Sequence, residues 1–235
     1  MTAPVVRVDG VRKSFAGLRP LRLQSLEIAP GERVALGGLE PGVTELLVNL
    51  ITGASLPDAG TISVFGRSTA DISSGDEWLT SLDRFGIVSP RAVVLEGSTL
   101  QQNLALPFTL QIDPIPPSVL GQVSALAAEC GIDAALLPKP AGELAAGVRV
   151  RAHLARAVAL NPSLLLIEHP TVDVAESDRL SLARDIAAVA DGRGAAALIM
   201  TADVEFAEAV AHRSLALQPA TGAVVPWKRK RGWFR

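Results

Sequence analysis

The sequence has a single cysteine, nearly balanced numbers of acidic and basic residues and no long apolar run, and each of these features excludes a class of protein. Its one cysteine, Cys130, excludes a disulfide framework and a zinc site built on several cysteines. We therefore expect the protein to work in the reducing cytoplasm. The 22 basic and 24 acidic residues leave a net charge of -2, which argues against a nucleic-acid partner. The longest apolar run, Ala195–Met200, is far below the roughly 20 residues that span a bilayer.

The composition is otherwise that of a soluble globular protein, with 49% hydrophobic and 20% charged residues. A chain of 235 residues can bury about 70% of the surface that its unfolded form exposes, so it needs neither disulfides nor metals to fold. Residues Met1–Val11 have neither the basic nor the apolar region of a signal peptide, and we expect no such signal here.

Buried strand patterns alternate with helical patterns along most of the chain. The predicted strands cover Val5 to Val8, Leu21–Ile28, Glu32–Leu36, Thr61–Phe65, Leu164–Ile167 and Ala195–Thr201. The predicted helices cover Thr44–Thr52, Val148–Leu160 and Glu176–Ala190, and the proline-punctuated stretch 98–146 is mostly helical. A turn is predicted at Pro57–Gly60. Strands that alternate with helices indicate an α/β fold with a largely parallel sheet.

Five stretches resemble the ATP-binding subunit of ABC transporters, in the same order and over nearly the whole chain. They read SLEIAPGERVALGG from Ser25, LLVNLITG from Leu46, PDAGTISVFGR from Pro57, TLQQNLALPF from Thr99 and VRVRAHLARAVALNPSLLLIEHPTVDV from Val148. The resemblance implies a P-loop NTPase-like core with a mostly parallel sheet, an N-terminal antiparallel β portion and a helical subdomain insertion. It predicts a single fold over residues 1–226, with core segments 1–97 and 147–226, insertion 98–146 and a separate tail 227–235.

The phosphate-binding loop of that family reads G-x-x-x-x-G-K-[ST], because backbone N–H groups and a lysine hold the phosphates while a hydroxyl holds magnesium. In this chain Gly38 and Gly42 remain as candidate loop residues. The second glycine, the lysine and the hydroxyl are replaced by Val43, Thr44 and Glu45. The only lysines are Lys13, Lys139, Lys228 and Lys230, so no shift of register restores the motif. Thr44 is either a displaced hydroxyl ligand or part of a loop that caps a core helix.

The resemblance places the family's other functional positions on equally altered residues. Glu168 stands at the position of the magnesium-binding aspartate, and it keeps a negative charge that can hold a metal. His169 stands at the position of the glutamate that polarises water, and it is either a general base or a packing residue. Pro90 replaces the glutamine that links the metal site to the helical subdomain, and Ala202 replaces the switch histidine. The signature loop L-S-G-G-Q becomes Leu144, Ala145, Ala146, Gly147 and Val148.

Two further features have both a functional and a structural interpretation. Phe15 lies where the family often stacks an aromatic ring on adenine, although an aromatic residue near a strand end is more often part of the core. The tail Trp227–Arg235 interleaves five basic and three aromatic residues. It is either a contact with an anionic membrane surface or a solvated chain end.

The resemblance therefore predicts an ABC-type nucleotide-binding-domain fold that has lost turnover, a pseudo-ATPase with a structural or regulatory role. Family members dimerise head to tail, with each ATP held by the phosphate loop of one subunit and the signature loop of the other. The expected partners are a membrane permease subunit and a second nucleotide-binding subunit, identical or not, at the cytoplasmic face of the cell membrane. The alternative is an active transport subunit that binds ATP and Mg²⁺ through atypical residues, with Glu168 on the metal and His169 as base.

Overall fold

Two β-sheets form the framework of the computed structural model, which describes residues 3–15 and 19–228. The antiparallel sheet has the strand order β2-β1-β4-β5, with β1 Val6–Lys13, β2 Leu21–Ile28, β4 Ala59–Val64 and β5 Arg67–Ser68. The second sheet has the order β10-β9-β3-β8-β7-β6 and is parallel except at β10. Its strands are β3 Arg33–Gly37, β6 Phe85–Val88, β7 Leu164–Glu168, β8 Ala196–Met200, β9 Arg213–Gln218 and β10 Ala223–Pro226.

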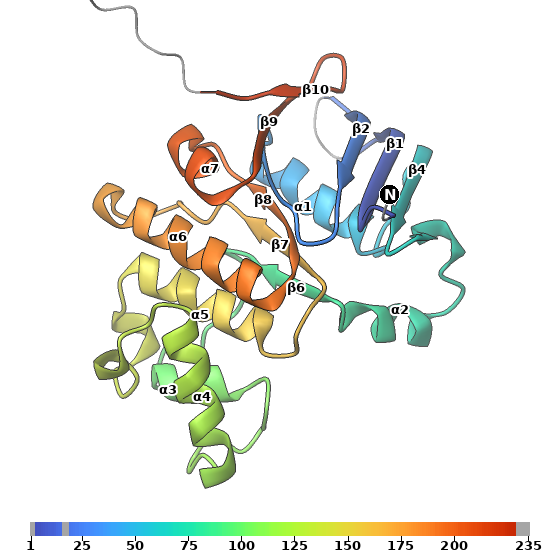
Figure 1. The fold of residues 1–235 in the computed structure, drawn as a ribbon. Helices are drawn as coiled ribbons and strands as arrows, with labels where there is room; N and C mark the ends of the chain where they lie inside the picture. The colour runs from blue at the N-terminus through green and yellow to red at the C-terminus, as the bar shows by residue number, and fades with distance from the viewer. Residues whose placement is uncertain (1–2, 16–18, 229–235) are drawn as a thin grey trace, which may run out of the picture.

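The helices are α1 Pro41–Ile51, α2 Gly75–Leu82, α3 Leu100–Ala105, α4 Pro117–Glu129, α5 Ala146–Val158, α6 Glu176–Arg193 and α7 Val204–Val210. Helix α1 covers one face of the larger sheet, and α5 and α6 cover the other (Figure 1). Helix α1 lies between the two sheets, whereas α3 and α4 lie at the end of the molecule far from the antiparallel sheet. Within the described residues, no helix is long and apolar enough to cross a bilayer.

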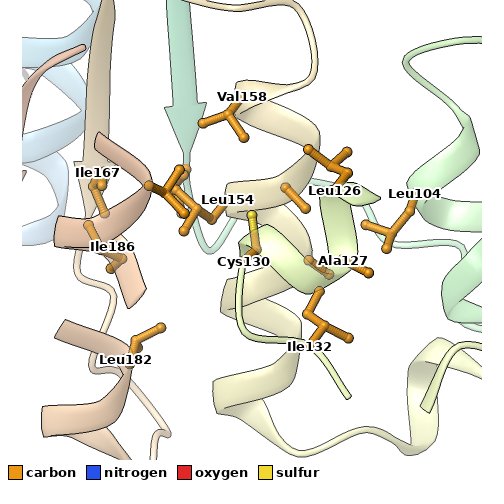
Figure 2. Packing of buried hydrophobic residues seen from close by; sticks show 14 of the residues in the cluster. Leu104, Leu126, Ala127, Cys130, Ile132, Leu154, Val158, Ile167, Leu182 and Ile186 are labelled. Atoms are coloured by element: carbon orange, nitrogen blue, oxygen red, sulfur yellow. The ribbon is translucent and has the colours of Figure 1, made fainter. Parts of the chain in front are cut away.

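Two hydrophobic clusters hold the layers together, and strand β7 contributes to both. Leu164 and Leu166 belong to the cluster beneath the antiparallel sheet, whereas Leu165 and Ile167 belong to the cluster against α3 to α6. This alternation follows from the two-residue period of a strand, and it explains why the strand reads as an unbroken apolar run. Figure 2 shows the second cluster, in which Cys130 is buried among aliphatic side chains. Burying each leucine or isoleucine contributes about 1.5–3 kcal/mol.

The mixed α/β architecture with one parallel and one antiparallel sheet confirms the predicted fold class, and β2 has the predicted bounds. Helix α1 begins three residues earlier than predicted, at Pro41, because proline is pre-organised for the first helical position. The turn predicted at Pro57–Gly60 is wrong at its end, since β4 already begins at Ala59. Gly60 has a φ of +81°, and a Cβ there would lie 2.4 Å from the Gly10 carbonyl carbon.

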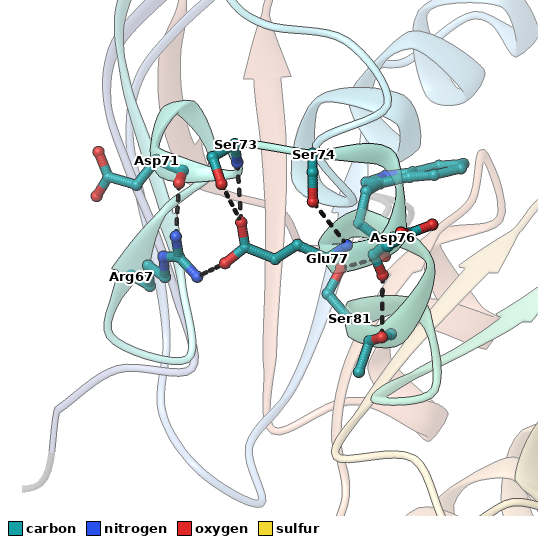
Figure 3. Close-up of polar contacts among 9 residues, drawn as sticks. Arg67, Asp71, Ser73, Ser74, Asp76, Glu77 and Ser81 are labelled. Carbon is teal, nitrogen blue, oxygen red and sulfur yellow. Dashed lines mark hydrogen bonds and ion pairs between the residues drawn. The ribbon is translucent and has the colours of Figure 1, made fainter.

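Helix α2 is absent from the sequence prediction, although polar side chains fix its start (Figure 3). The Ser74 hydroxyl accepts a hydrogen bond from the Glu77 N–H at 3.2 Å. The Glu77 carboxylate accepts bonds from the backbone N–H and the hydroxyl of Ser73, both at 2.9 Å, and pairs with Arg67. The Ser73 backbone bond, followed by the Arg67 bond, lowers the pKa of Glu77 to about 2.

Candidate functional site

The loop between β3 and α1 takes the place of a phosphate-binding loop, and its geometry follows from two residues. Gly38 has a φ of +80°, and a Cβ there would lie 2.5 Å from the Leu217 carbonyl oxygen, so only glycine fits. Pro41 occupies the first turn of α1 and has no N–H to offer an anion. The N–H groups of Val43 and Thr44 both donate to the Glu40 carbonyl at 2.9 Å.

Thr44, which the sequence prediction assigns to the family's lysine, is fully buried, with 0% of its surface exposed. Its hydroxyl donates to the Glu40 carbonyl oxygen at 3.1 Å and lies 3.0 Å from His169 Nε2. A hydroxyl has one proton, so this pair is satisfied when a neutral His169 ring donates from Nε2. Burial, with a smaller effect of the Arg91 charge, lowers the pKa of His169 and favours that neutral ring.

Arg91 joins Glu45 and Glu168, the two acidic residues predicted from the family's magnesium site. Its Nη1 lies 3.3 Å from Glu45 Oε2, and its Nη2 donates to Glu168 Oε1 at 2.9 Å. The Glu168 side chain is only 1% exposed, and within the described residues its Oε2 has no hydrogen-bond partner. Burial raises the pKa of Glu168, and the Arg91 charge acts in the opposite direction.

A cavity of 130 Å³ brings together several of the positions predicted from the sequence. Glu168, His169, Pro90 and the signature-loop residue Ala146 all line it. His153 also lines this cavity, and burial, followed by the charges of two neighbouring arginines, lowers the pKa of its ring to about 4. The structure therefore gathers residues predicted for the metal, base, glutamine and signature positions around one small space.

The remaining predicted residues lie elsewhere. Phe15 lines a separate cavity of 360 Å³ with Gly38, Glu40 and Val43, and it also packs against the core beneath the antiparallel sheet. Ala202 lines neither cavity; it borders another hollow beside α7. Gly42 is the second residue of α1, and no atom lies within 4 Å of a Cβ placed there.

The signature-loop segment forms the start of α5. Leu144 is buried, and Ala145 precedes the helix without a side-chain cap, because alanine has no oxygen to accept the free N–H groups. The Val148 N–H donates to the Ala145 carbonyl at 3.0 Å. A Cβ on Gly147 would lie 1.9 Å from Asp178 Oδ2.

Of the predicted tail, only Trp227 and Lys228 belong to the described residues, and 229–235 lie outside them. The Trp227 N–H donates to the Ser214 carbonyl at 2.8 Å. Its ring lies against Gly37, where a Cβ would be 2.6 Å from a ring carbon. The first residue of the tail is thus anchored at the end of β3, just before the loop.

Sequence reasoning missed Arg91 and His153. Arg91 follows β6, the neighbour of β7, and parallel strands bring their carboxyl ends to one edge of a sheet. That signal was available, because Glu168 ends β7 and Arg91 lies three residues after the end of β6. His153 gives no comparable signal, since nothing in its surrounding helix pattern indicates that it borders a cavity.

The comparisons with known proteins agree with this architecture. A family model described as ABC transporter matches residues 21–172. The sulfate/thiosulfate import ATP-binding protein CysA of Caulobacter vibrioides is 28% identical over 211 residues, which are 88% of this chain and 60% of that protein. The methionine import ATP-binding protein MetN of Brucella abortus is 28% identical over 220 residues, 92% of this chain and 58% of that protein. The chain thus spans about three fifths of the length of these relatives.

Solved structures with the same fold are cassettes of this kind. A dimeric ATP-binding cassette in a post-hydrolysis state, bound to ADP and phosphate, has a TM-score of 0.75 at 20% identity and covers 97% of this chain and 100% of its own. The protein cbiO1 from Clostridium perfringens, part of an ABC transporter complex, has a TM-score of 0.75 at 18% identity over 95% and 88% of the two chains. At these identities the likeness concerns the fold.

Proposed function

The chain belongs to the ABC transporter family, and from that premise we propose that it is an ATP-binding-subunit homologue of an import system that does not turn over ATP. The relatives named as import ATP-binding proteins support the assignment to import systems. The role of such a pseudo-ATPase is structural or regulatory within a membrane transport complex.

The observation that carries this proposal is the contact between Thr44 and His169. Their side chains are 3.0 Å apart. The family resemblance assigns Thr44 to a phosphate-binding lysine and His169 to a water-polarising glutamate. A lysine supplies a positive charge that the γ-phosphate needs as negative charge redistributes in the transition state. A buried hydroxyl bonded to a neutral imidazole supplies none, so the main source of transition-state stabilisation is missing.

Two carboxylates, one just before α1 and one in its first half, add to this loss. Glu40 and Glu45 are both exposed beside the start of α1, where a triphosphate would lie. Like charges about 4 Å apart repel by about 4 kcal/mol at an effective dielectric of about 20. Arg91 forms an ion pair with Glu45, but the same guanidinium also pairs with Glu168. The loop therefore offers poor electrostatic complementarity to ATP.

The partners follow from the family rather than from the geometry of this chain. We propose a permease subunit and a second nucleotide-binding subunit as partners, at the inner face of the cell membrane. The division into core segments 1–97 and 147–226, insertion 98–146 and tail 227–235 remains part of the proposal, as does contact of the tail with anionic lipid. Head-to-tail pairing with an intact subunit would leave one composite site without a phosphate loop and the other without a signature loop.

Phosphate release from ATP by the purified chain tests the proposal against an active subunit. We expect wild type, Glu168→Gln and His169→Ala to release phosphate at the same rate as a blank without protein. Wild-type hydrolysis that both substitutions abolish would contradict the proposal. It would instead establish the alternative, in which Glu168 holds Mg²⁺ and His169 is the base.

A further inference from the structure

Arg91 lies between two carboxylates that come from different elements. Glu45 belongs to the first half of α1, and Glu168 is the last residue of β7. Arg91 belongs to the loop after β6, and its two terminal nitrogens point to one acid each, at 3.3 Å and 2.9 Å. A single cation therefore joins three segments that are far apart in the sequence.

The family resemblance assigns both acids to positions that hold the divalent cation, but their present arrangement does not fit a metal. Mg²⁺ needs oxygen ligands at about 2.0–2.1 Å in octahedral geometry. Here Glu168 Oε1 accepts a hydrogen bond from the guanidinium, and Glu45 Oε2 faces the same group. Within the described residues, no group of three or more histidine, cysteine, aspartate or glutamate side chains has the geometry to hold a metal ion.

A guanidinium suits this role better than an ammonium would. Its five N–H donors are fixed in a plane, so that two acids can be contacted from two nitrogens at once. The Glu168 side chain is almost fully buried, whereas the side chains of Arg91 and Glu45 are 45% and 49% exposed. Arg91 therefore supplies a positive charge to a carboxylate that is almost completely shielded from solvent. Removing the partner of a buried charge is strongly destabilising.

We propose that Arg91 is a built-in cation that takes the place of a divalent metal ion in this site. It holds the start of α1, the end of β7 and the loop after β6 together without metal or nucleotide. The inference rests on the proposed function, because an arginine held here excludes the magnesium ion that hydrolysis needs. It also adds a consequence: the chain keeps the geometry of this site in the absence of any ligand.

Manganese binding without nucleotide tests this inference, with the paramagnetic resonance signal of free Mn²⁺ as the readout. Wild type is expected to leave the free Mn²⁺ signal unchanged at millimolar metal. Arg91→Gln frees Glu45 and Glu168, and it is expected to bind Mn²⁺ at least about tenfold more tightly than wild type. Arg149→Gln is the matched control, because Arg149 lines a cavity together with Glu168 but donates to the Leu144 carbonyl instead of to either acid.

The melting temperature provides a second readout. Arg91→Gln is expected to melt below wild type and to recover on addition of Mn²⁺, whereas Arg91→Gln combined with Glu168→Gln should not respond to the metal. If Arg91→Gln is unfolded without metal, folding on addition of MnCl₂ supports the inference, and failure to fold at any Mn²⁺ concentration overturns it.

Equal Mn²⁺ binding by wild type and Arg91→Gln would also overturn the inference. The experiment contains no nucleotide, so its failure is separate from that of the proposed function. ATP hydrolysis by wild type would contradict the proposed function. Binding of Mn²⁺ by wild type, without ATP hydrolysis, would contradict only the role of Arg91.

Discussion

Thr44 shows how one residue changes the chemistry of the loop. The Thr44 hydroxyl turns inward, where it donates to the Glu40 carbonyl and lies 3.0 Å from His169 Nε2. The residue is fully buried, so its hydroxyl has no access to solvent water. A buried hydroxyl of this kind contributes to folding because leaving its partners unpaired costs more than forming the bond gains.

Thr44→Val is therefore expected to destabilise the fold. The substitution keeps the shape but removes the hydroxyl, and it leaves the ring nitrogen of His169 without its partner. We expect a loss of about 1–2 kcal/mol in the free energy of unfolding, measured by urea denaturation.

Thr52→Val is the matched control on the same helix. The Thr52 hydroxyl is also buried, but it bonds only to the carbonyls of Val48 and Asn49 one turn earlier. Its loss should cost less than that of Thr44, and an equal cost for the two variants would argue against a specific role for the contact with His169.

At the scale of single elements, helix α5 depends on a glycine in its first turn. Gly147 lies against Asp178 of α6, and Asp178 pairs with the buried Arg151 of α5 at 2.9 Å. Arg151 also contacts Asp185, so it keeps one acidic partner if Asp178 moves. The contact between α5 and α6 thus limits what the signature-loop segment tolerates.

Gly147→Ala is expected to push the Asp178 carboxylate away from Arg151. The lost charged hydrogen bond costs about 1.5–3 kcal/mol, and the better helix propensity of alanine returns about 1 kcal/mol, so a net loss of about 1 kcal/mol is expected in urea denaturation.

Gly192→Ala in α6 is the control, since no atom lies within 4 Å of a Cβ there. It should stabilise the protein by up to about 1 kcal/mol. Stabilisation of similar size by both substitutions would contradict the packing account.

Helix α2 provides a prediction about pH at its first turn. The pKa of Glu77 is lowered from 4.5 to about 2, so the carboxylate stabilises the folded state above pH 4.5 and loses this contribution as the pH falls towards 2. Urea denaturation should show wild type more stable than Glu77→Gln near neutrality, with the difference shrinking between pH 4.5 and 2.

Asp76→Asn is the control for that experiment. It removes a negative charge from the same turn but none of the bonds to Ser73 and Arg67. A stability difference between wild type and Glu77→Gln that stays constant as the pH falls would show that these bonds do not hold the carboxylate ionised.

At the scale of the whole molecule, the buried elements could be predicted from the sequence. Strand β7 and helix α6 have long apolar patterns, and the sequence predicts both with nearly the observed bounds. Helix α2 has no buried residue, so it carries no apolar period to detect. Strands β9 and β10 are only partly buried, and their patterns are correspondingly weak.

The site was predictable in part, for a different physical reason. The family's spacing predicts Thr44, Glu45, Glu168 and His169 as site residues, and the structure brings their side chains close to one another or to Arg91. The bonds among them depend on how α1, β6 and β7 meet in space. Arg91 belongs to no family motif, so only the three-dimensional arrangement brings it between two acids.

Calorimetric titration of the purified protein with Mg-ATP to millimolar concentration, checked by thermal shift, tests whether the chain binds ATP. We expect no heat of binding and no change in melting temperature. Binding with a Kd below about 100 μM, which corresponds to more than about 5.5 kcal/mol, would contradict this expectation. Such binding would require the loop after β3 to hold phosphate without the family's lysine.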